Sequence, residues 1–181
     1  MAVDNNLVTS SKLQELHNSE GPSKFGFLAQ ALLAVCFSRL GARQIKVKSN
    51  GHPDISMLFN GKNWKIETEV MSNNSHSHVL KNEDIEAVKP NAAHEVGYLV
   101  LLDLRLPVCW HLIPSYRIPR GDKEYPLLRI KLMEDKVLSS ELTTHLHDVV
   151  SSYYQTISAQ GFSGLGQFIE QESNEILFFS E

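Results

Sequence analysis

Acidic side chains and a histidine are concentrated in the stretch HPDISMLFNGKNWKIETEVM, which has Asn60-Gly61 near its centre. An Asn-Gly pair between two β-prone runs predicts a hairpin with a two-residue type I′ turn. In that register Asp54 lies opposite Glu67, and Glu69 shares their face because side chains alternate along a strand. Carboxylates placed across a strand pair repel one another unless something compensates. The simplest compensation is a hard divalent cation bound by their oxygens, so the spacing predicts a metal site.

The same register assigns the other side chains of the hairpin to two faces. His52 is predicted opposite Glu69, and Ser56 opposite Lys65, on the acidic face, whereas apolar side chains form the other face. The alternative is an ordinary solvent-exposed strand face whose carboxylates are neutralised by Lys65 or a nearby arginine. Three acids, a histidine and a lysine converging on one face favour the metal site over this alternative.

Apolar periodicity predicts the elements that hold the hairpin in place. A helix is expected over 24–40, followed by a strand over 44–48, the hairpin, and a second helix over 79–88. The later expected elements are strands over 96–104, 110–113 and 127–132, a helix over 139–159 and a loop over 161–166. With 181 residues, the chain is expected to be a single α/β domain. Its core, at about 24–132, would combine a helix with a mixed central sheet and flanking helices, followed by a C-terminal helical segment at about 139–181.

Pro53-Asp54 followed by Glu67-Thr68-Glu69 resembles the signature of the PD-(D/E)xK nuclease superfamily, whose members share a restriction-endonuclease-like fold. The predicted order of a helix, three meandering strands, a helix and a fourth strand is similar to that family over about residues 24–104. The resemblance implies hydrolysis of a phosphodiester bond by water, with Mg²⁺ as cofactor and Mn²⁺ as a substitute. It identifies Asp54 and Glu67 as the metal ligands and as catalytic residues.

Glu69 departs from the family pattern because it replaces the usual lysine. Some type II restriction enzymes resemble this chain in having Glu-x-Glu and are active, so Glu69 is expected to act as a general base. The positive charge of the absent lysine would come from Lys65, on the same face, or from Lys81 near the start of the next helix. Gln30 is the closest match to the glutamate that many members have on the first helix. Together with His52 it is predicted to support the site.

The net charge of −4 hides an uneven distribution along the chain. Residues 1–131 carry 16 basic and 13 acidic side chains, whereas residues 132–181 carry one basic and eight acidic side chains. A bound cation would offset three of the acids in the first part, and the basic side chains there could then bind a phosphate backbone. The predicted nucleic-acid contacts are Lys46, Lys48, Lys62, Arg117 and Arg120.

These features together predict a Mg²⁺-dependent endonuclease that is similar to type II restriction enzymes and acts on DNA. A homodimer is expected, because cleaving both strands of a duplex usually takes two copies of a subunit this small. Two alternatives stay open at this point. One is an RNA endonuclease, and the other is a catalytically inactive nuclease fold that serves as a binding or assembly module.

The remaining sequence features predict no further site. Cys36 and Cys109 lie in apolar surroundings, which is typical of buried thiols in a reducing cytosol rather than of disulfides or a cysteine-based zinc site. His76 and His78 fall in a Ser/Asn-rich stretch that is expected to be a surface or nucleic-acid-contacting loop rather than a pair of metal ligands. With no signal peptide and no membrane-spanning stretch in the sequence, the protein is expected to be cytoplasmic.

Overall fold

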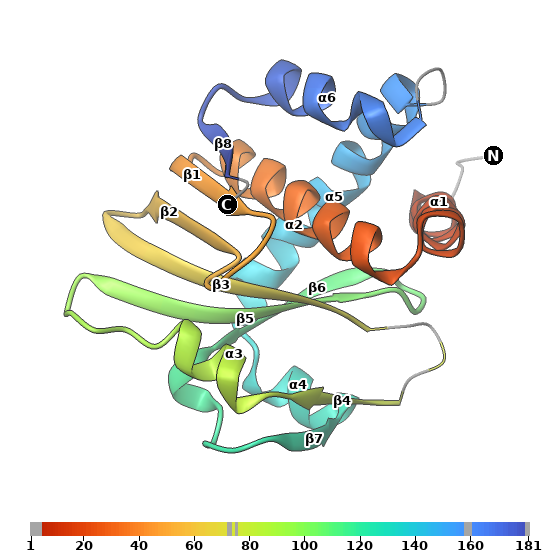
Figure 1. Cartoon of the computed structure of the whole chain (residues 1–181). Helices are drawn as coiled ribbons and strands as arrows, with labels where there is room; N and C mark the ends of the chain where they lie inside the picture. The colour runs from red at the N-terminus through yellow and green to blue at the C-terminus, as the bar shows by residue number, and fades with distance from the viewer. Residues whose placement is uncertain (1–4, 72–73, 75, 158–160, 180–181) are drawn as a thin grey trace.

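A mixed sheet of six strands forms the centre of the molecule, with helices on both of its faces (Figure 1). The structure is a computed structural model that describes residues 5–71, 74, 76–157 and 161–179. The strand order is β6-β5-β3-β2-β1-β8, in which β3 runs parallel to β5 and β1 parallel to β8. The strands are β1 (Arg43–Lys48), β2 (Ile55–Phe59), β3 (Lys62–Met71), β5 (Glu95–Asp103), β6 (Cys109–Pro114) and β8 (Ile176–Phe179). The α/β class with a mixed central sheet and flanking helices is thus confirmed.

The helices divide between the two faces of this sheet. On one face lie α2 (Pro22–Arg39) and α5 (Lys136–Ile157), with α1 (Asn5–Glu20) packed against both. On the other face lie α3 (Asn82–Ala87), α4 (Leu127–Met133) and a two-stranded sheet of β4 (Ser77–Leu80) and β7 (Lys123–Pro126). Helix α6 (Leu165–Glu172) precedes β8, and short 3₁₀ helices cover Ser115–Arg117 and Gly161–Gly164. None of the helices in the described part of the chain is long and apolar enough to cross a membrane.

The hairpin that joins β2 to β3 has the register predicted from the sequence. Ile55 pairs with Ile66, and Ser56 pairs with Lys65. Asn60 and Gly61 both have positive φ angles, 50° and 71°, as a type I′ turn requires. The ladder stops at the Ile55–Ile66 pair, so Asp54 lies one residue before β2 rather than inside it.

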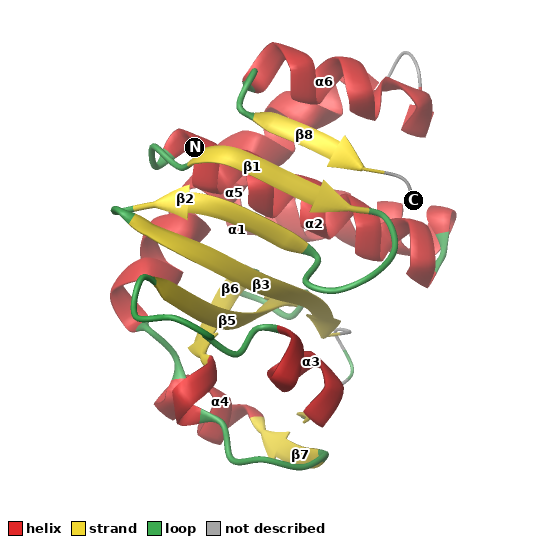
Figure 2. Ribbon diagram, turned by 60° about the vertical axis from the view of Figure 1, so that its left-hand side comes forward, coloured by secondary structure: helices red, strands yellow, loops and turns green. Residues whose placement is uncertain are grey.

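The two faces of the sheet are covered to different extents. Strand β5 is buried on both faces, since Val100 packs on the α2 side and Leu99 on the α3 side. On the α3 side, however, Lys46 of β1 is exposed and Ser56 of β2 is half-buried. Figure 2 shows this face, with the helices behind β1, β2 and β8 and α3 beside β5. The α3 face therefore consists of a covered part over β3 and β5 and an open part over β2, β1 and β8.

Gly97 of β5 allows α3 to approach the sheet closely. A Cβ atom at this position would overlap the backbone carbonyl group of Val88, which caps the C-terminus of α3. Only glycine leaves this space empty. Because α3 carries Asp84, this close approach determines where the Asp84 carboxyl group lies relative to β3.

Several predicted elements are wrong and need correction. Residues 127–132 form helix α4 rather than a strand. The prediction failed because the periodicity of a short apolar run does not distinguish a strand from a helix. The run is also not fully buried, since Leu128 is 73% exposed. Val79 belongs to strand β4 rather than to the following helix. The C-terminal segment is not entirely helical, because β8 returns to pair with β1. Helix α1 was missed, since few of its side chains are apolar; Leu13 and Leu16 are buried there.

The two cysteines differ in their surroundings. Both are free, as predicted, and Cys36 is fully buried in apolar surroundings. Cys109 is only half-buried, and its Sγ lies 3.5 Å from His111 Nε2, so the prediction of an apolar environment is wrong for this residue. The neighbours of Cys109 along the chain are apolar, but β6 pairs with β5 and brings Asp103 directly opposite it.

Candidate metal-binding site

Four carboxyl groups meet on the α3 face of the sheet, where β2 begins and β3 ends. Asp54 immediately precedes β2, Glu67 and Glu69 lie on β3, and Asp84 lies on α3. Glu67 and Asp84 are almost completely buried, with 4% and 5% of their surface exposed. Carboxyl groups are rarely so buried unless they are paired or bind a cation, so this arrangement calls for a ligand or shared protons.

Asp54 is held against β3 by two contacts. Its Oδ2 accepts a hydrogen bond of 2.8 Å from the backbone N–H of Thr68, and its carboxyl group hydrogen bonds to that of Glu67. Glu67 is also approached by His52, whose Nδ1 lies 2.7 Å from Glu67 Oε1. The sequence predicted His52 opposite Glu69; this is wrong, because the chain leaves the ladder before residue 55 and the alternation does not extend to His52.

Glu69 has its own set of partners. His78 Nε2 lies 2.8 Å from Glu69 Oε2, and the Asp84 carboxyl group hydrogen bonds to Glu69. Burial by itself would raise the pKa of Glu69, but these hydrogen bonds and the charge of Lys81 outweigh burial and lower it. Glu69 is therefore the carboxyl group of the cluster that is most readily ionised, which suits a proton acceptor.

The other three carboxyl groups hold protons more tightly than usual. Burial, together with the charges of Asp54 and Asp84, raises the pKa of Glu67 to about 9. Burial and the hydrogen bond to Glu69 raise the pKa of Asp84 to about 7, and burial also raises the pKa of Asp54. Four carboxylates this close cannot all be ionised without a counter-charge. A divalent cation would replace the shared protons.

Donor atoms for such a cation are present within a small volume. One donor atom each from His52, Glu67 and Asp84 lies within 4.8 Å of the other two. Asp84 Oδ2 is buried and has no hydrogen-bond partner among the described residues. A buried oxygen without a partner is unfavourable unless a ligand or water completes its contacts, so Asp84 Oδ2 fits a metal ligand. Two carboxylates completed by water are what Mg²⁺ usually uses.

The predicted catalytic residue Lys65 and the predicted supporting residues Lys81 and Gln30 lie in different places. Lys81 is close enough for its charge to act on Glu69 and Asp84. Lys65 shares the strand face, but its Nζ forms an ion pair of 2.8 Å with Glu95 Oε2. Gln30 is not part of the cluster, because α2 packs on the opposite face of the sheet. The family-based position of Gln30 is thus wrong, because the sheet lies between α2 and the acidic face of β3.

Asp84 and His78 are the members of the cluster that the sequence did not predict. Asp84 lies beside Ile85 in a short helix, and both side chains are buried. An acidic residue next to the apolar residue that anchors this helix was the sequence feature that could have indicated its place in the cluster. His78 was expected in a loop, but it lies in β4 and contacts Glu69, whereas His76 is exposed. Residues 72–73 and 75 of that expected loop lie outside the described residues.

The open part of the α3 face carries two of the predicted nucleic-acid contacts next to the acidic cluster. Lys46 pairs in register with Ser56, which places it on the face of Lys65 and Glu67. Lys48 follows two residues later, and its backbone N–H donates to the carbonyl of Asp54. Strand β8 adds Leu177 and Phe179, the register partners of these lysines, which are 52% and 43% exposed. We call Lys46, Lys48, Leu177 and Phe179 the β1–β8 surface.

The remaining predicted contacts lie elsewhere. The Arg117 guanidinium donates hydrogen bonds to the backbone carbonyls of Met133 and Glu134 at the end of α4. Arg120 lies 3.9 Å from Glu86 of α3, and Lys62 is exposed at the hairpin turn. Arg117 is thus used to hold α4, which leaves the two lysines of β1 as the predicted nucleic-acid contacts that lie beside the acidic cluster.

In comparisons with family models and with curated proteins, no family and no protein matches the chain.

Proposed function

We propose that the protein is a Mg²⁺-dependent nuclease of the restriction-endonuclease-like class that cleaves DNA. The observation that carries the proposal is the buried carboxyl cluster of Asp54, Glu67, Glu69 and Asp84, in which Asp84 Oδ2 has no partner among the described residues. The element order supports it: α2, the antiparallel β1–β2–β3 meander, α3, and β5 parallel to β3.

The residues of the cluster divide into two roles in this proposal. Glu67 and Asp84 would hold Mg²⁺ together with Asp54, whose carboxyl group hydrogen bonds to that of Glu67. His52 would orient Glu67 through its 2.7 Å contact. When bound, the cation would stabilise negative charge on the scissile phosphate and make water a stronger nucleophile. Glu69 would accept the proton of the attacking water, because its lowered pKa keeps it ionised at neutral pH. His78 Nε2, which lies 2.8 Å from Glu69 Oε2, would hold the Glu69 carboxylate in position and stabilise its negative charge.

The β1–β8 surface supports nucleic acid as the substrate. Lys46 and Lys48 would contact backbone phosphates beside the cluster, and the exposed Phe179 ring offers a surface for a base or sugar. We propose that two copies act together on duplex DNA, because one chain contains one such cluster among the described residues. Sedimentation of the purified protein, with and without a DNA duplex, measures this directly.

A nuclease assay tests the proposal. Purified protein is incubated with plasmid DNA, single-stranded DNA and RNA, in Mg²⁺, Mn²⁺ or EDTA. We expect cleavage of DNA that requires a divalent ion, and a loss of at least about 100-fold in Glu67→Gln and in Asp84→Asn, since each removes a charged ligand. Glu86→Gln, on the outer side of the same helix as Asp84, is the matched control and retains activity.

Two other results would redirect the proposal. Equal cleavage by wild type and both variants would mean that the activity does not come from this cluster. Metal-dependent DNA binding without cleavage would favour the inactive binding module. Two observations favour this alternative: Glu69 replaces the family lysine, and Lys65 is paired with Glu95. Cleavage of RNA alone would identify the substrate as RNA.

A further inference from the structure

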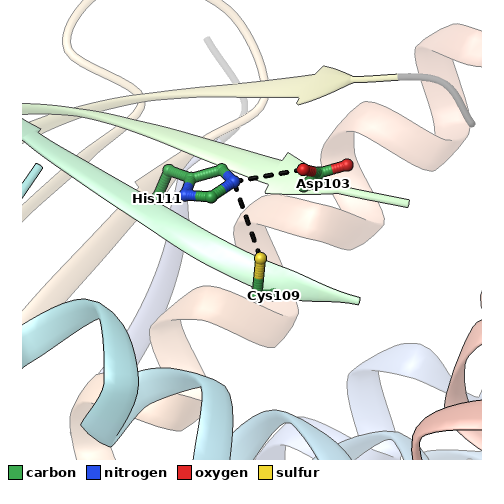
Figure 3. A group of neighbouring side chains, drawn as sticks. All are labelled: Asp103, Cys109 and His111. Atoms are coloured by element: carbon green, nitrogen blue, oxygen red, sulfur yellow. Dashed lines mark hydrogen bonds and ion pairs between the residues drawn. The ribbon is translucent and has the colours of Figure 1, made fainter. Parts of the chain in front are cut away.

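A second group of metal-ligating side chains lies at the end of β5 and the start of β6, separate from the carboxyl cluster (Figure 3). Asp103 pairs with Cys109 across these strands, and His111 pairs with Leu101. Because side chains alternate along a strand, all three residues project from the same face of the sheet. Figure 3 shows the His111 ring directed toward both Asp103 and Cys109.

The distances within this group match those expected around one tetrahedral ion. Cys109 Sγ lies 3.5 Å from His111 Nε2, which in turn lies 3.1 Å from Asp103 Oδ2. Tetrahedral Zn²⁺ with ordinary bond lengths separates a sulfur from a nitrogen ligand by about 3.6 Å, and a nitrogen from an oxygen ligand by about 3.4 Å. The S···N and N···O distances thus lie within a few tenths of an ångström of the tetrahedral values, and the donor atoms of Asp103 and Cys109 lie within 4.8 Å of each other.

Further residues hold the donors in the orientation that a metal requires. His111 Nδ1 lies 2.7 Å from Glu134 Oε2, which fixes the ring and leaves Nε2 directed at Cys109 and Asp103. The Arg105 guanidinium donates two hydrogen bonds to Asp103, of 2.8 and 2.7 Å, and orients that carboxylate. A carboxylate behind the distal nitrogen of a histidine is the usual outer contact of a metal-bound imidazole.

We propose that Asp103, Cys109 and His111 bind a Zn²⁺ ion, with Glu134 and Arg105 as positioning residues and a water or a fourth ligand completing the shell. A thiolate and an imidazole select Zn²⁺ over Mg²⁺ and Ca²⁺, which prefer oxygen ligands. This site is therefore chemically distinct from the carboxyl cluster, and it stands whether or not the protein is a nuclease.

The surroundings are suited to a positive ion that arrives from solvent. Asp103 and His111 are 3% and 2% exposed, but Cys109 is half-buried and lines, with His111 and Glu134, a cleft of about 630 Å³. The His111 ring lies between the carboxylates of Asp103 and Glu134, so a Zn²⁺ ion at Nε2 would lie beside negatively charged groups.

A thiol-based catalytic pair explains the geometry less well. In such a pair one imidazole nitrogen serves the thiol and the other serves a carboxylate. Here Nε2 faces Asp103 at 3.1 Å, closer than it faces Cys109, so both ring nitrogens are engaged by carboxylates. His111 is therefore a poor base for the thiol and a well-oriented ligand for a metal.

Metal substitution of the full-length protein tests the proposal. The protein is reduced, freed of metal with a chelator, and titrated with Co²⁺, whose thiolate charge-transfer absorption reports a Co–S bond. The affinity for Zn²⁺ is measured by competition with a chromophoric chelator. We expect a charge-transfer band that saturates at one equivalent of Co²⁺. Addition of Zn²⁺ must displace the Co²⁺ and abolish this band. The carboxyl cluster has no sulfur and does not contribute to this band.

The variants assign the band to its residues. Cys109→Ser must abolish the band and weaken Zn²⁺ binding at least 100-fold, whereas Cys36→Ala, the other cysteine, must retain both. Glu134→Gln should keep the band but weaken Zn²⁺ binding by about 10- to 100-fold, as expected for an outer contact. Circular dichroism shows that each variant is folded. If Cys109→Ser is unfolded, a second measurement on the wild type replaces this variant. Zn²⁺ should then protect Cys109 from a thiol-alkylating reagent, and the buried Cys36 serves as the internal reference.

Three results would overturn the proposal. These are the absence of a charge-transfer band in the wild type, a band that persists in folded Cys109→Ser, and alkylation of Cys109 that Zn²⁺ does not slow. Any of them would mean that Asp103, His111, Glu134 and Arg105 form an ion-pair network that holds α4 against the sheet and binds no metal.

Discussion

At the scale of single residues, Glu67 connects the two halves of the carboxyl cluster. It contacts His52 on one side and Asp54 on the other, and the charge of Asp84 acts on it. Its pKa of about 9 means that the metal-free protein holds a proton there at neutral pH. The folded protein therefore binds more protons than the unfolded chain between about pH 4.5 and 9, because the unfolded glutamate has its ordinary pKa.

The first prediction concerns stability and pH. A group whose pKa is raised by folding stabilises the fold below its unfolded pKa, and that contribution is lost as the pH rises through the folded pKa. In EDTA, we expect the melting temperature to fall from pH 5 to pH 9, and the fall to be smaller in Glu67→Gln, which does not ionise. Thermal unfolding followed by circular dichroism measures both slopes.

The control for this experiment is Glu86→Gln, because Glu86 lies on the same face of the molecule outside the cluster and its side chain is 41% exposed. It should retain the wild-type slope. A slope in Glu67→Gln as steep as in the wild type would mean that Glu67 does not hold the proton. Saturating Mn²⁺ should raise the melting temperature of the wild type more at high pH than at low pH, since the ion then displaces fewer protons.

At the scale of elements, α3 determines whether the cluster is complete. It is short, six residues, and such a helix is not stable by itself in water. Its position depends on burial of Ile85 and Val88 against β5 and on the space left by Gly97. Asp84 therefore reaches Glu69 only because the helix packs tightly on the sheet.

Gly97→Ala tests this dependence. The added Cβ would overlap the carbonyl group of Val88, so α3 must move away from β5. We expect a loss of about 1–3 kcal/mol in the free energy of unfolding, as for other overpacked positions, together with a loss of most of the Mn²⁺-induced stabilisation. Chemical denaturation with and without Mn²⁺ separates the two effects.

Gly26→Ala in α2 is the matched control, because a Cβ there meets no atom within 4 Å. Alanine is favoured over glycine within a helix, so this variant should be as stable as the wild type or up to about 1 kcal/mol more stable, with an unchanged response to Mn²⁺. If Gly97→Ala retains the full Mn²⁺ response, α3 is not needed to place Asp84.

At the scale of the whole molecule, helices cover one face of the sheet while the other is covered over only part of its width (Figure 2). The open part is the β1–β8 surface, and it adjoins the carboxyl cluster. The net charge of the chain is −4, yet this surface carries two lysines: Lys46 lies between Ser56 and Leu177, and Lys48 lies beside Asp54 of the carboxyl cluster. The distribution of charge, rather than its sum, makes contact with a phosphate backbone favourable here.

A charge reversal on this surface gives the corresponding prediction. Lys46→Glu/Lys48→Glu should weaken binding of duplex DNA, and the slope of log affinity against log salt should fall by about 2, since each phosphate contact contributes about 0.9. Fluorescence anisotropy at several salt concentrations measures this slope in Ca²⁺ or EDTA. Lys12→Glu/Lys24→Glu, on helices at the opposite face, has the same change in net charge and should have little effect.

The sequence by itself was sufficient to predict the hairpin and the acids that it brings together. The Asn60-Gly61 turn and the alternation of side chains are local signals, so the register and the juxtaposition of Asp54 and Glu67 did not depend on the rest of the fold. The same local reasoning failed once the chain left the ladder, and His52 contacts Glu67 instead of Glu69.

Only the tertiary structure decided which distant residues join each site. Asp84 and His78 reach Glu69 through the packing of α3 and the pairing of β4 with β7, and β8 pairs with β1 across more than a hundred intervening residues. Cys109 lies in an apolar stretch of sequence, but the pairing of β6 with β5 places it beside Asp103. Contacts between residues far apart in the chain are determined by how the buried faces pack, and no local pattern records that choice.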